Sequence, residues 1–204
     1  MINFKNIIFD LGNVLLDIEY NKTTIAFEAL GFKDFKNTYS PQRMISLFKD
    51  IETGRISEDN FYSSLKAISP VPVSTEQLKN AWNALLMDFR VSSLEYLKKL
   101  APVYNIYLLS NTNSIHLTAF DQILATAGQP PLDSYFIKAY YSNIIGHRKP
   151  DAGSYRYVLD DARISASETM FIDDLHINIE GAKAVGLQTH LLLPSERIEN
   201  LELL

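Results

Sequence analysis

Short apolar runs alternate along the chain with longer segments in which apolar residues recur every three or four positions. The runs that predict strands buried on both faces lie at residues 7–9, 106–109, 170–172 and 190–193 and, more weakly, within 135–141. The periodic segments that predict helices lie at residues 92–100, 154–161 and 177–185. This alternation indicates an α/β fold built on a doubly wound parallel sheet.

Residues 18–89 break this rhythm, because several helical patterns follow one another there and no run predicts a strand. A capping box begins at Ser74, and Ser57 begins another amphipathic helix. We therefore predict a helical cap of residues 18–89, inserted into a core domain of residues 1–17 and 90–204. Such a cap would lie over the strand ends and act as a lid.

Composition narrows the function classes. Hydrophobic residues make up 47% of the 204 positions, which is enough for a packed interior, and the net charge is -5 with no basic run. We therefore expect small-molecule partners and neither a nucleic-acid nor a membrane partner. Cysteine is absent, so disulfides and thiolate metal sites are excluded. With no long apolar segment at the N-terminus or elsewhere, a cytoplasmic protein is expected; its oligomeric state is not predicted.

Polar side chains follow three of the predicted strands. They are Asp10 after the first, Ser110 and Asn111 after the second, and Asp173 and Asp174 after the third. Because the carboxyl ends of parallel strands meet at one edge of a sheet, we expect these side chains to lie together. A carboxylate such as Asp10 can attack phosphorus, and paired carboxylates suit Mg²⁺.

The remaining parts of a phosphoryl-transfer site are hydrogen-bond donors and a cation. Ser110 and Asn111 can donate to phosphoryl oxygens, and Lys149 stands before a proline at a loop edge, where its ammonium can neutralise developing charge. Each residue alone has an ordinary explanation as a turn, cap or surface residue, and Arg148 is expected on the surface. The adjacent pair Asp160 and Asp161, at the end of a helical pattern, shows that paired carboxylates alone prove little.

In this order, the four segments resemble the motifs of the haloacid dehalogenase superfamily of aspartate-nucleophile hydrolases. The segments similar to its first to fourth motifs are residues 9–14, 109–111, 148–151 and 172–174. The helical insertion resembles the small α-helical cap of that family. Within the family the chain looks most like bacterial sugar-phosphate phosphatases, including one that acts on glucose phosphorylated at the anomeric carbon. It also resembles the phosphatase domain of some epoxide hydrolases.

The resemblance implies a role for each motif residue. Asp10 would be the nucleophile that carries an aspartyl-phosphate, and Lys149 would assist it. The Mg²⁺ ligands would be Asp10, the carbonyl of Gly12 and Asp174, with Asp173 acting through water. The phosphate would be held by Ser110, Asn111 and Lys149.

Gly12 departs from the pattern of the family. Its phosphatases usually carry a second aspartate there, which protonates the leaving group. A backbone carbonyl can still bind the metal, but it cannot transfer a proton. Asp17 could substitute, although a place at the hinge or first turn of the cap is favoured for it; water or a substrate hydroxyl are the other candidates.

The leading hypothesis is a Mg²⁺-dependent phosphatase of small phosphorylated metabolites, with sugar phosphates and above all anomeric phosphates preferred. A catalytically weak phosphate-binding or regulatory protein is the first alternative, because of Gly12. A 2-haloacid dehalogenase is the second; it is less favoured because such an enzyme needs no metal.

Substrate identity is not determined by these motifs. Arg43 and Arg55 in the cap are candidate substrate contacts, and Tyr20 has suitable chemistry. Trp82 lies at a helix position where packing is the favoured explanation. The histidines His116 and His147 have no partners at metal-ligand spacing, so surface or capping roles are favoured for them.

Overall fold

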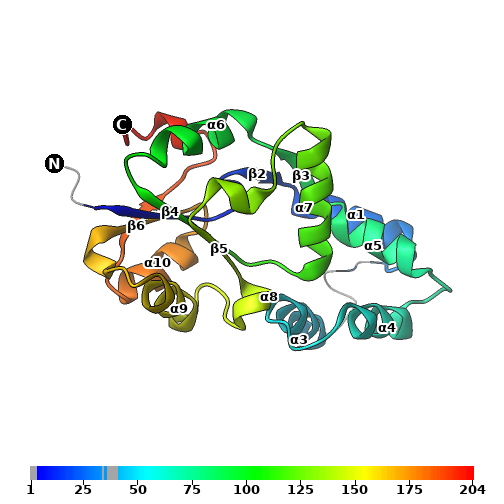
Figure 1. Ribbon diagram of the computed structural model, residues 1–204. Helices are drawn as coiled ribbons and strands as arrows, with labels where there is room; N and C mark the ends of the chain where they lie inside the picture. The colour runs from blue at the N-terminus through cyan, green and yellow to red at the C-terminus, as the bar shows by residue number, and fades with distance from the viewer. Residues whose placement is uncertain (1–3, 34, 36–40) are drawn as a thin grey trace.

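The computed structural model of the protein describes residues 4–33, 35 and 41–204, and its centre is a five-stranded parallel sheet of order β5-β4-β1-β6-β7 (Figure 1). The strands are β1 (Asn6–Phe9), β4 (Asn105–Ser110), β5 (Lys138–Tyr141), β6 (Thr169–Asp173) and β7 (Gln188–Leu191). In the central register Phe9 lies opposite Leu108 on one side and Ile172 on the other. The prediction of a doubly wound parallel sheet is confirmed.

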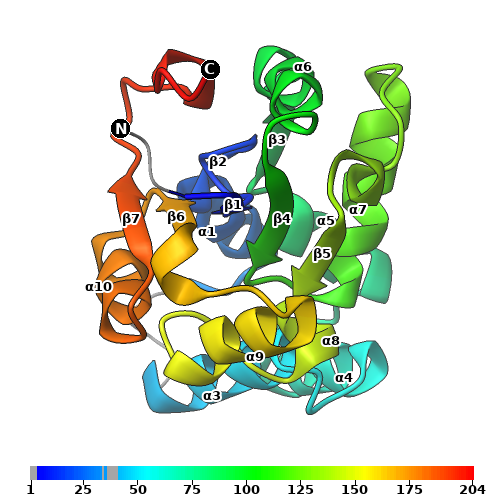
Figure 2. The same cartoon turned by 60° about the vertical axis from the view of Figure 1, so that its left-hand side comes forward.

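Helices cover both faces of this sheet (Figure 2). One face carries α6 (Val91–Leu100) and α7 (Ser114–Thr126), and the other carries α9 (Ala152–Ala162) and α10 (His176–Ala184). The shorter helices are α8 (Ser142–Ile145), η1 (Leu132–Tyr135), η2 (Ala166–Glu168) and η3 (Ile198–Asn200). In the part of the chain that is described, no helix combines the length and apolar character that crossing a membrane requires.

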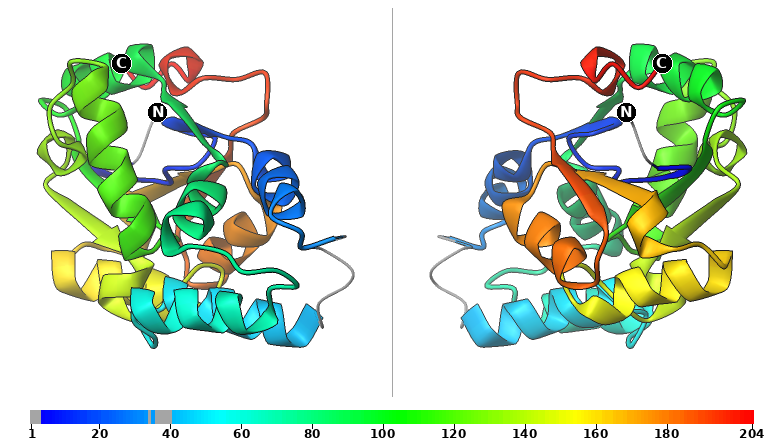
Figure 3. Two further views of the ribbon diagram at one scale, coloured as in Figure 1. Left: turned by 90° about the vertical axis from the view of Figure 1, so that its right-hand side faces the viewer. Right: turned by 90° about the vertical axis from the view of Figure 1, so that its left-hand side faces the viewer.

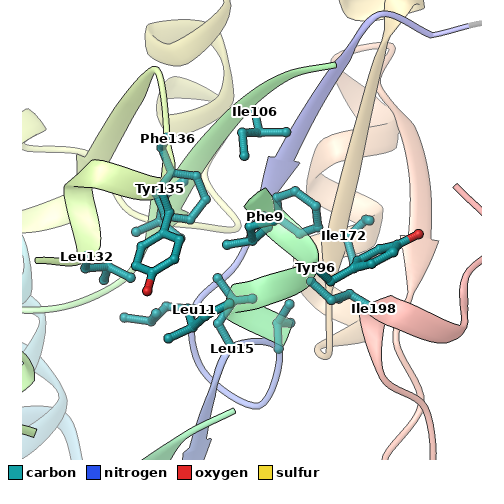
Figure 4. Packing of buried hydrophobic residues seen from close by; sticks show 14 of the residues in the cluster. Phe9, Leu11, Leu15, Tyr96, Ile106, Leu132, Tyr135, Phe136, Ile172 and Ile198 are labelled. Carbon is teal, nitrogen blue, oxygen red and sulfur yellow. The ribbon is translucent and has the colours of Figure 1, made fainter. Parts of the chain in front are cut away.

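The side chains of β1 alternate between two hydrophobic cores. Ile7 and Phe9 pack with residues of α6 and α7 on one face, and Figure 4 shows Phe9 in this cluster with Ile172 and with Tyr96 of α6. Ile8 packs on the other face with residues of α9 and α10. Both faces are covered, so the strand is apolar at each position after Asn6 and carries no alternating pattern. The edge strand β7 differs: it is half-buried throughout and begins two residues before the predicted run.

Four further helices of the described residues form a separate helical region beside the sheet (Figures 1 and 3). They are α1 (Tyr20–Ala29), α3 (Pro41–Glu52), α4 (Glu58–Ile68) and α5 (Thr75–Asn83). The predicted capping box is present, because Ser74 and Gln77 exchange side chain-to-backbone hydrogen bonds at the start of α5. The helical region encloses its own aromatic core, which includes Phe27, Phe61 and Trp82. The boundaries of a cap at 18 and 89 stay a prediction.

The expectation that residues 18–89 contain no strand is wrong. A short antiparallel ribbon joins β2 (Leu16–Ile18) to β3 (Leu86–Phe89), with Ile18 opposite Leu86. Strands of three and four residues are too short to produce a period in the sequence, and each one pairs with a segment about 70 positions away. The ribbon leads the chain from the sheet into the helical region and back.

Candidate active site

A cavity of about 520 Å³ lies over the carboxyl ends of the central strands. Asp10 follows β1, Ser110 ends β4 and Asp174 follows β6, and all three line this cavity. The parallel register explains their proximity, because β1 is hydrogen-bonded to both β4 and β6. The opposite side of the cavity is formed by residues of the helical region and of the β2–β3 ribbon.

Lys149 lies at the centre of the strand ends and is 1% exposed. Its Nζ donates to Asp10 Oδ1 at 2.5 Å and to Asp173 Oδ2 at 2.7 Å. Burial by itself lowers the pKa of Lys149, but the attraction of the two carboxylates outweighs it and raises the pKa, so the ammonium stays charged. Burial raises the pKa of Asp10 to about 7, against the opposing effect of Lys149.

Three carboxylates converge beside this ammonium. Asp10, Asp173 and Asp174 each offer an oxygen, and these atoms lie within 4.8 Å of one another. Burial raises the pKa of the Asp174 carboxyl, whose Oδ2 accepts a hydrogen bond from Asn13 Nδ2 at 2.9 Å. A cluster of hard oxygen donors with repelling charges fits Mg²⁺.

Asp173 accepts more hydrogen bonds than Asp10 or Asp174 among the contacts described. Its Oδ1 accepts from the backbone N–H of Leu175 at 2.8 Å, and Asn178 Nδ2 lies 3.0 Å from both of its oxygens. With Lys149 also bound, little coordination capacity is left on Asp173. This agrees with the predicted contact through water, which stays a prediction.

Asn111 does more than the sequence indicated. Its Nδ2 donates to the carbonyl of Lys149 at 2.9 Å, and its Oδ1 accepts from the Lys149 backbone N–H at 2.8 Å. The amide therefore clamps the backbone that carries the ammonium, and only its second N–H remains for a phosphate. Ser110 is buried and lines the cavity.

The structure does not bring Asp17 into the cavity. Asp17 lies on β2, and its Oδ1 accepts from Arg90 Nε at 2.7 Å across the ribbon. The favoured place at the hinge describes this position better than a proton-transfer role. Gly12 does line the cavity, and a Cβ added there would lie 3.3 Å from Ile18 Cγ1.

An ion pair that the sequence did not reveal connects the sheet to the helical region. Arg148 Nε and Nη2 each lie 2.9 Å from Glu52 Oε2, at the end of α3, and both residues line the cavity. Burial raises the pKa of Glu52, with Arg148 opposing the shift. Arg148 keeps 31% of its side chain exposed and is held in this ion pair, so it is half-buried and not the solvated surface residue that was expected. Its partner is 96 positions away, and no local spacing indicates it.

Comparison with known proteins is consistent with this geometry. The model of one protein family, described as a haloacid dehalogenase-like hydrolase, matches residues 4–186. The chain belongs to this family. The three carboxylates and Lys149 lie within the matched residues, at the site described above.

Similar proteins narrow the activity. The D-ribitol-5-phosphate phosphatase of Bacteroides thetaiotaomicron is 33% identical over 91% of this chain and 90% of its own length. A haloacid dehalogenase family enzyme of the same organism, solved with magnesium and inorganic phosphate, superposes with a TM-score of 0.86 at 30% identity, covering 98% of this chain and 99% of its own. A structure of a hydrolase of this type from Porphyromonas gingivalis superposes with a TM-score of 0.86 at 30% identity over 95% and 93% of the two chains.

These findings confirm the predictions of a phosphoric monoester hydrolase and of Mg²⁺ as its cofactor. The chain is a magnesium-dependent haloacid dehalogenase-like phosphatase. The roles assigned to individual site residues stay predictions.

Of the other residues considered as substrate contacts, the structure places only some at the cavity. Arg55 is largely exposed, pairs with Asp50 at 3.6 Å and does not line the cavity, whereas the side chain of Arg43 lies outside the described residues. Tyr20 lines the cavity. His147 is exposed, as expected.

Of the surface and capping roles expected for His116, the surface role is wrong and the capping role fits its position. Its ring is buried and stacks on Trp82 with 5.2 Å between ring centroids, and both residues line the cavity. Asn113 Oδ1 accepts a hydrogen bond from the His116 backbone N–H, which fixes the orientation of the Asn113 amide. The amide nitrogen of Asn113 then points at His116 Nδ1 and donates to it, so Nδ1 carries no proton. Nε2 then donates to the carbonyl of Trp82 at 3.3 Å, and burial lowers the pKa of His116 to about 4. The residue is neutral and caps the end of α5.

Proposed function

We propose that the enzyme hydrolyses a small phosphate monoester through an aspartyl-phosphate on Asp10. The buried Asp10 carboxylate at the end of β1, beside Lys149, carries this proposal. An Asp10 oxygen forms a bond to phosphorus while the ester P–O bond breaks, and the released alkoxide takes a proton from water or from a substrate hydroxyl and departs as the alcohol. Water then attacks the phosphorus and releases inorganic phosphate, which regenerates the carboxylate.

The charges around Asp10 support this assignment. Lys149 keeps its proton, orients Asp10 through Oδ1 and lies where it can bind a phosphoryl oxygen, with Ser110 and Asn111 as further donors. Asp10, Asp174 and the Gly12 carbonyl would hold Mg²⁺, which supplies positive charge against the phosphate. The amide of Asn178 holds Asp173, so that the second carboxylate under Lys149 is fixed.

For the substrate we propose a sugar or sugar-alcohol phosphate. The activity of the Bacteroides relative, which its name gives as hydrolysis of D-ribitol-5-phosphate, supports the sugar alcohol. The cavity also offers polar groups for hydroxyls along one side, on Tyr20 and Thr24 of α1 and on the Glu52–Arg148 pair.

Gly12 supports a second, finer proposal. With no side-chain acid at this position, and with Asp17 held by Arg90, hydrolysis depends on how readily the alcohol leaves. General acid assistance contributes typically ~10²–10⁴-fold, so phosphates on an anomeric hydroxyl should be preferred over those on a primary alcohol of the same sugar.

The same glycine also supports the alternative of a phosphate-binding protein with weak turnover. A 2-haloacid dehalogenase has less support, because three converging carboxylates suit a metal that such an enzyme does not need.

The test is phosphate release by the purified protein with Mg²⁺ and with a chelator. The panel contains D-ribitol-5-phosphate, the 1- and 6-phosphates of glucose, acetyl phosphate and 2-chloropropionate. We expect Mg²⁺-dependent release that Asp10→Asn abolishes, with glucose 1-phosphate turned over faster than the 6-phosphate. Binding without turnover of any ester would favour the alternative, and chloride release would favour the dehalogenase.

A further inference from the structure

The cavity above the strand ends has two chemically different sides. One side carries the polar residues at the strand ends. The other side carries hydrocarbon and aromatic side chains and is here called the apolar wall; its residues are Ile18, Phe48, Trp82, Leu85, Leu86 and Phe120. Leu85 lies in the turn before β3, and the other residues come from the β2–β3 ribbon, two helices of the helical region and α7. A phosphate ester bound at Lys149 would therefore have an apolar surface close to its alcohol.

The apolar wall is built as a unit. Phe48 and Trp82 stack with 4.8 Å between ring centroids and 22° between ring planes, and His116 stacks on Trp82 from α7. On the ribbon, Ile18 and Leu86 are direct cross-strand partners, so their side chains are neighbours on one face. Packing of this kind fixes the shape of the wall before any ligand arrives.

Several polar side chains among the described residues of the cavity are already occupied. Thr23 Oγ1 donates to the Trp82 carbonyl at 3.4 Å. Both ring nitrogens of His116 are bound by Asn113 and Trp82, and the amide of Asn178 is bound to Asp173. Trp82 Nε1 and Thr112 Oγ1 are buried lining atoms without a hydrogen-bond partner among the described residues. Beside the side chains of Ile18, Leu86 and Phe120, which carry no polar atom, a sugar hydroxyl would lose its water without gaining a partner, whereas a hydrocarbon there gains from burial.

We propose that the cavity accepts a second substrate class, phosphate monoesters whose alcohol is apolar, such as pentyl or benzyl phosphate. The phosphate lies at Lys149 as in the proposed function, on which this inference rests, and the hydrocarbon lies against the apolar wall. The chemistry is unchanged: Asp10 takes the phosphoryl group, the P–O bond breaks and the alcohol leaves.

The experiment compares n-pentyl phosphate with D-ribitol-5-phosphate at saturating Mg²⁺. Both carry phosphate on a primary alcohol of a five-carbon chain, so the hydroxyls of ribitol are the main difference, and by induction these hydroxyls also make ribitol the more acidic leaving group. A site built to bind hydroxyls rejects an analogue that lacks them by about 10⁴-fold, so we expect kcat/KM for pentyl phosphate to lie within about tenfold of that for ribitol phosphate or above it. A value lower by more than about tenfold overturns the inference.

A pair of variants on one strand tests the apolar wall directly. Leu86→Gln should raise KM for pentyl phosphate at least about fivefold more than KM for acetyl phosphate, which is too small to reach the wall. Met87→Gln, at the next position on β3 and outside the cavity lining, should change neither value. Equal effects of Leu86→Gln on both substrates would overturn the inference, and turnover of acetyl phosphate shows that the variant is folded.

The two proposals fail differently. If no ester on the panel, acetyl phosphate included, releases phosphate, the proposed function is wrong. If ribitol phosphate and acetyl phosphate are hydrolysed and pentyl phosphate is not, only the second substrate class is lost.

Discussion

Replacing Asp10 by asparagine should make the metal-free protein more stable while removing its activity. The folded protein places this carboxylate in a buried position, where its pKa is raised from 3.8 to about 7, chiefly by burial and in spite of Lys149. A group whose pKa is raised on folding binds its proton more tightly in the folded state. At low pH, where Asp10 is protonated in both states, it does not destabilise the folded protein. As the pH rises from about 4 to about 7, Asp10 ionises in the unfolded chain first, and the folded protein loses stability.

The size of the effect follows from the shift. A change of about three units, at 1.36 kcal/mol per unit, corresponds to a cost of about 4 kcal/mol above pH 7 and of less than about 2 kcal/mol at pH 5. These values are upper limits, because asparagine also leaves Lys149 with Asp173 as its sole carboxylate partner among the contacts described. Asparagine has nearly the same shape and no charge, so the variant avoids this cost.

Thermal unfolding in the presence of a chelator tests this reasoning. For a chain of this length each kcal/mol shifts Tm by roughly 2–4 °C, so Asp10→Asn should raise Tm by several degrees at pH 8 and by less than half as much at pH 5. Asp160→Asn, at an exposed carboxylate, is the matched control and should change Tm at neither pH. A lower Tm for Asp10→Asn at pH 8, or a gain that does not depend on pH, would refute the electrostatic argument.

Three further substitutions test the site. Asp174→Ala should weaken Mg²⁺ binding at least about tenfold in a calorimetric titration, and the same change at Asp160 should not; equal losses would contradict the metal assignment. Glu52→Gln should leave the free energy of unfolding in urea unchanged or raise it at pH 8, because burial raises the pKa of Glu52 in spite of Arg148, so folding already disfavours the charged carboxylate; a clear loss would show that the pair with Arg148 outweighs burial. Gly12→Asp should raise kcat for a primary-alcohol phosphate at least about tenfold, provided that Ile18 yields by a few tenths of an ångström; an unchanged kcat would mean that protonation of the alcohol does not limit turnover.

The sequence by itself determined the features that depend only on residues close together in the chain. The strands that end at Asp10 and Asp173 are buried on both faces, so they appear as unbroken apolar runs followed by a carboxylate. The start of α5 is equally local, because Ser74 and the residue three positions later satisfy each other's backbone donors. The order of these segments was enough to predict the sheet and the carboxylates at its edge.

Only the tertiary structure decided which distant residues meet. The β2–β3 ribbon, the pair of Glu52 with Arg148 and the clamp of Asn111 on Lys149 all join segments separated by tens of positions. The sequence could not decide between a surface and a capping role for His116, because its partner, the carbonyl of Trp82, is brought to it by packing of α5 on α7. Hydrophobic periodicity records which face of an element is buried and not what lies against that face, so contacts of this kind leave no pattern in the sequence.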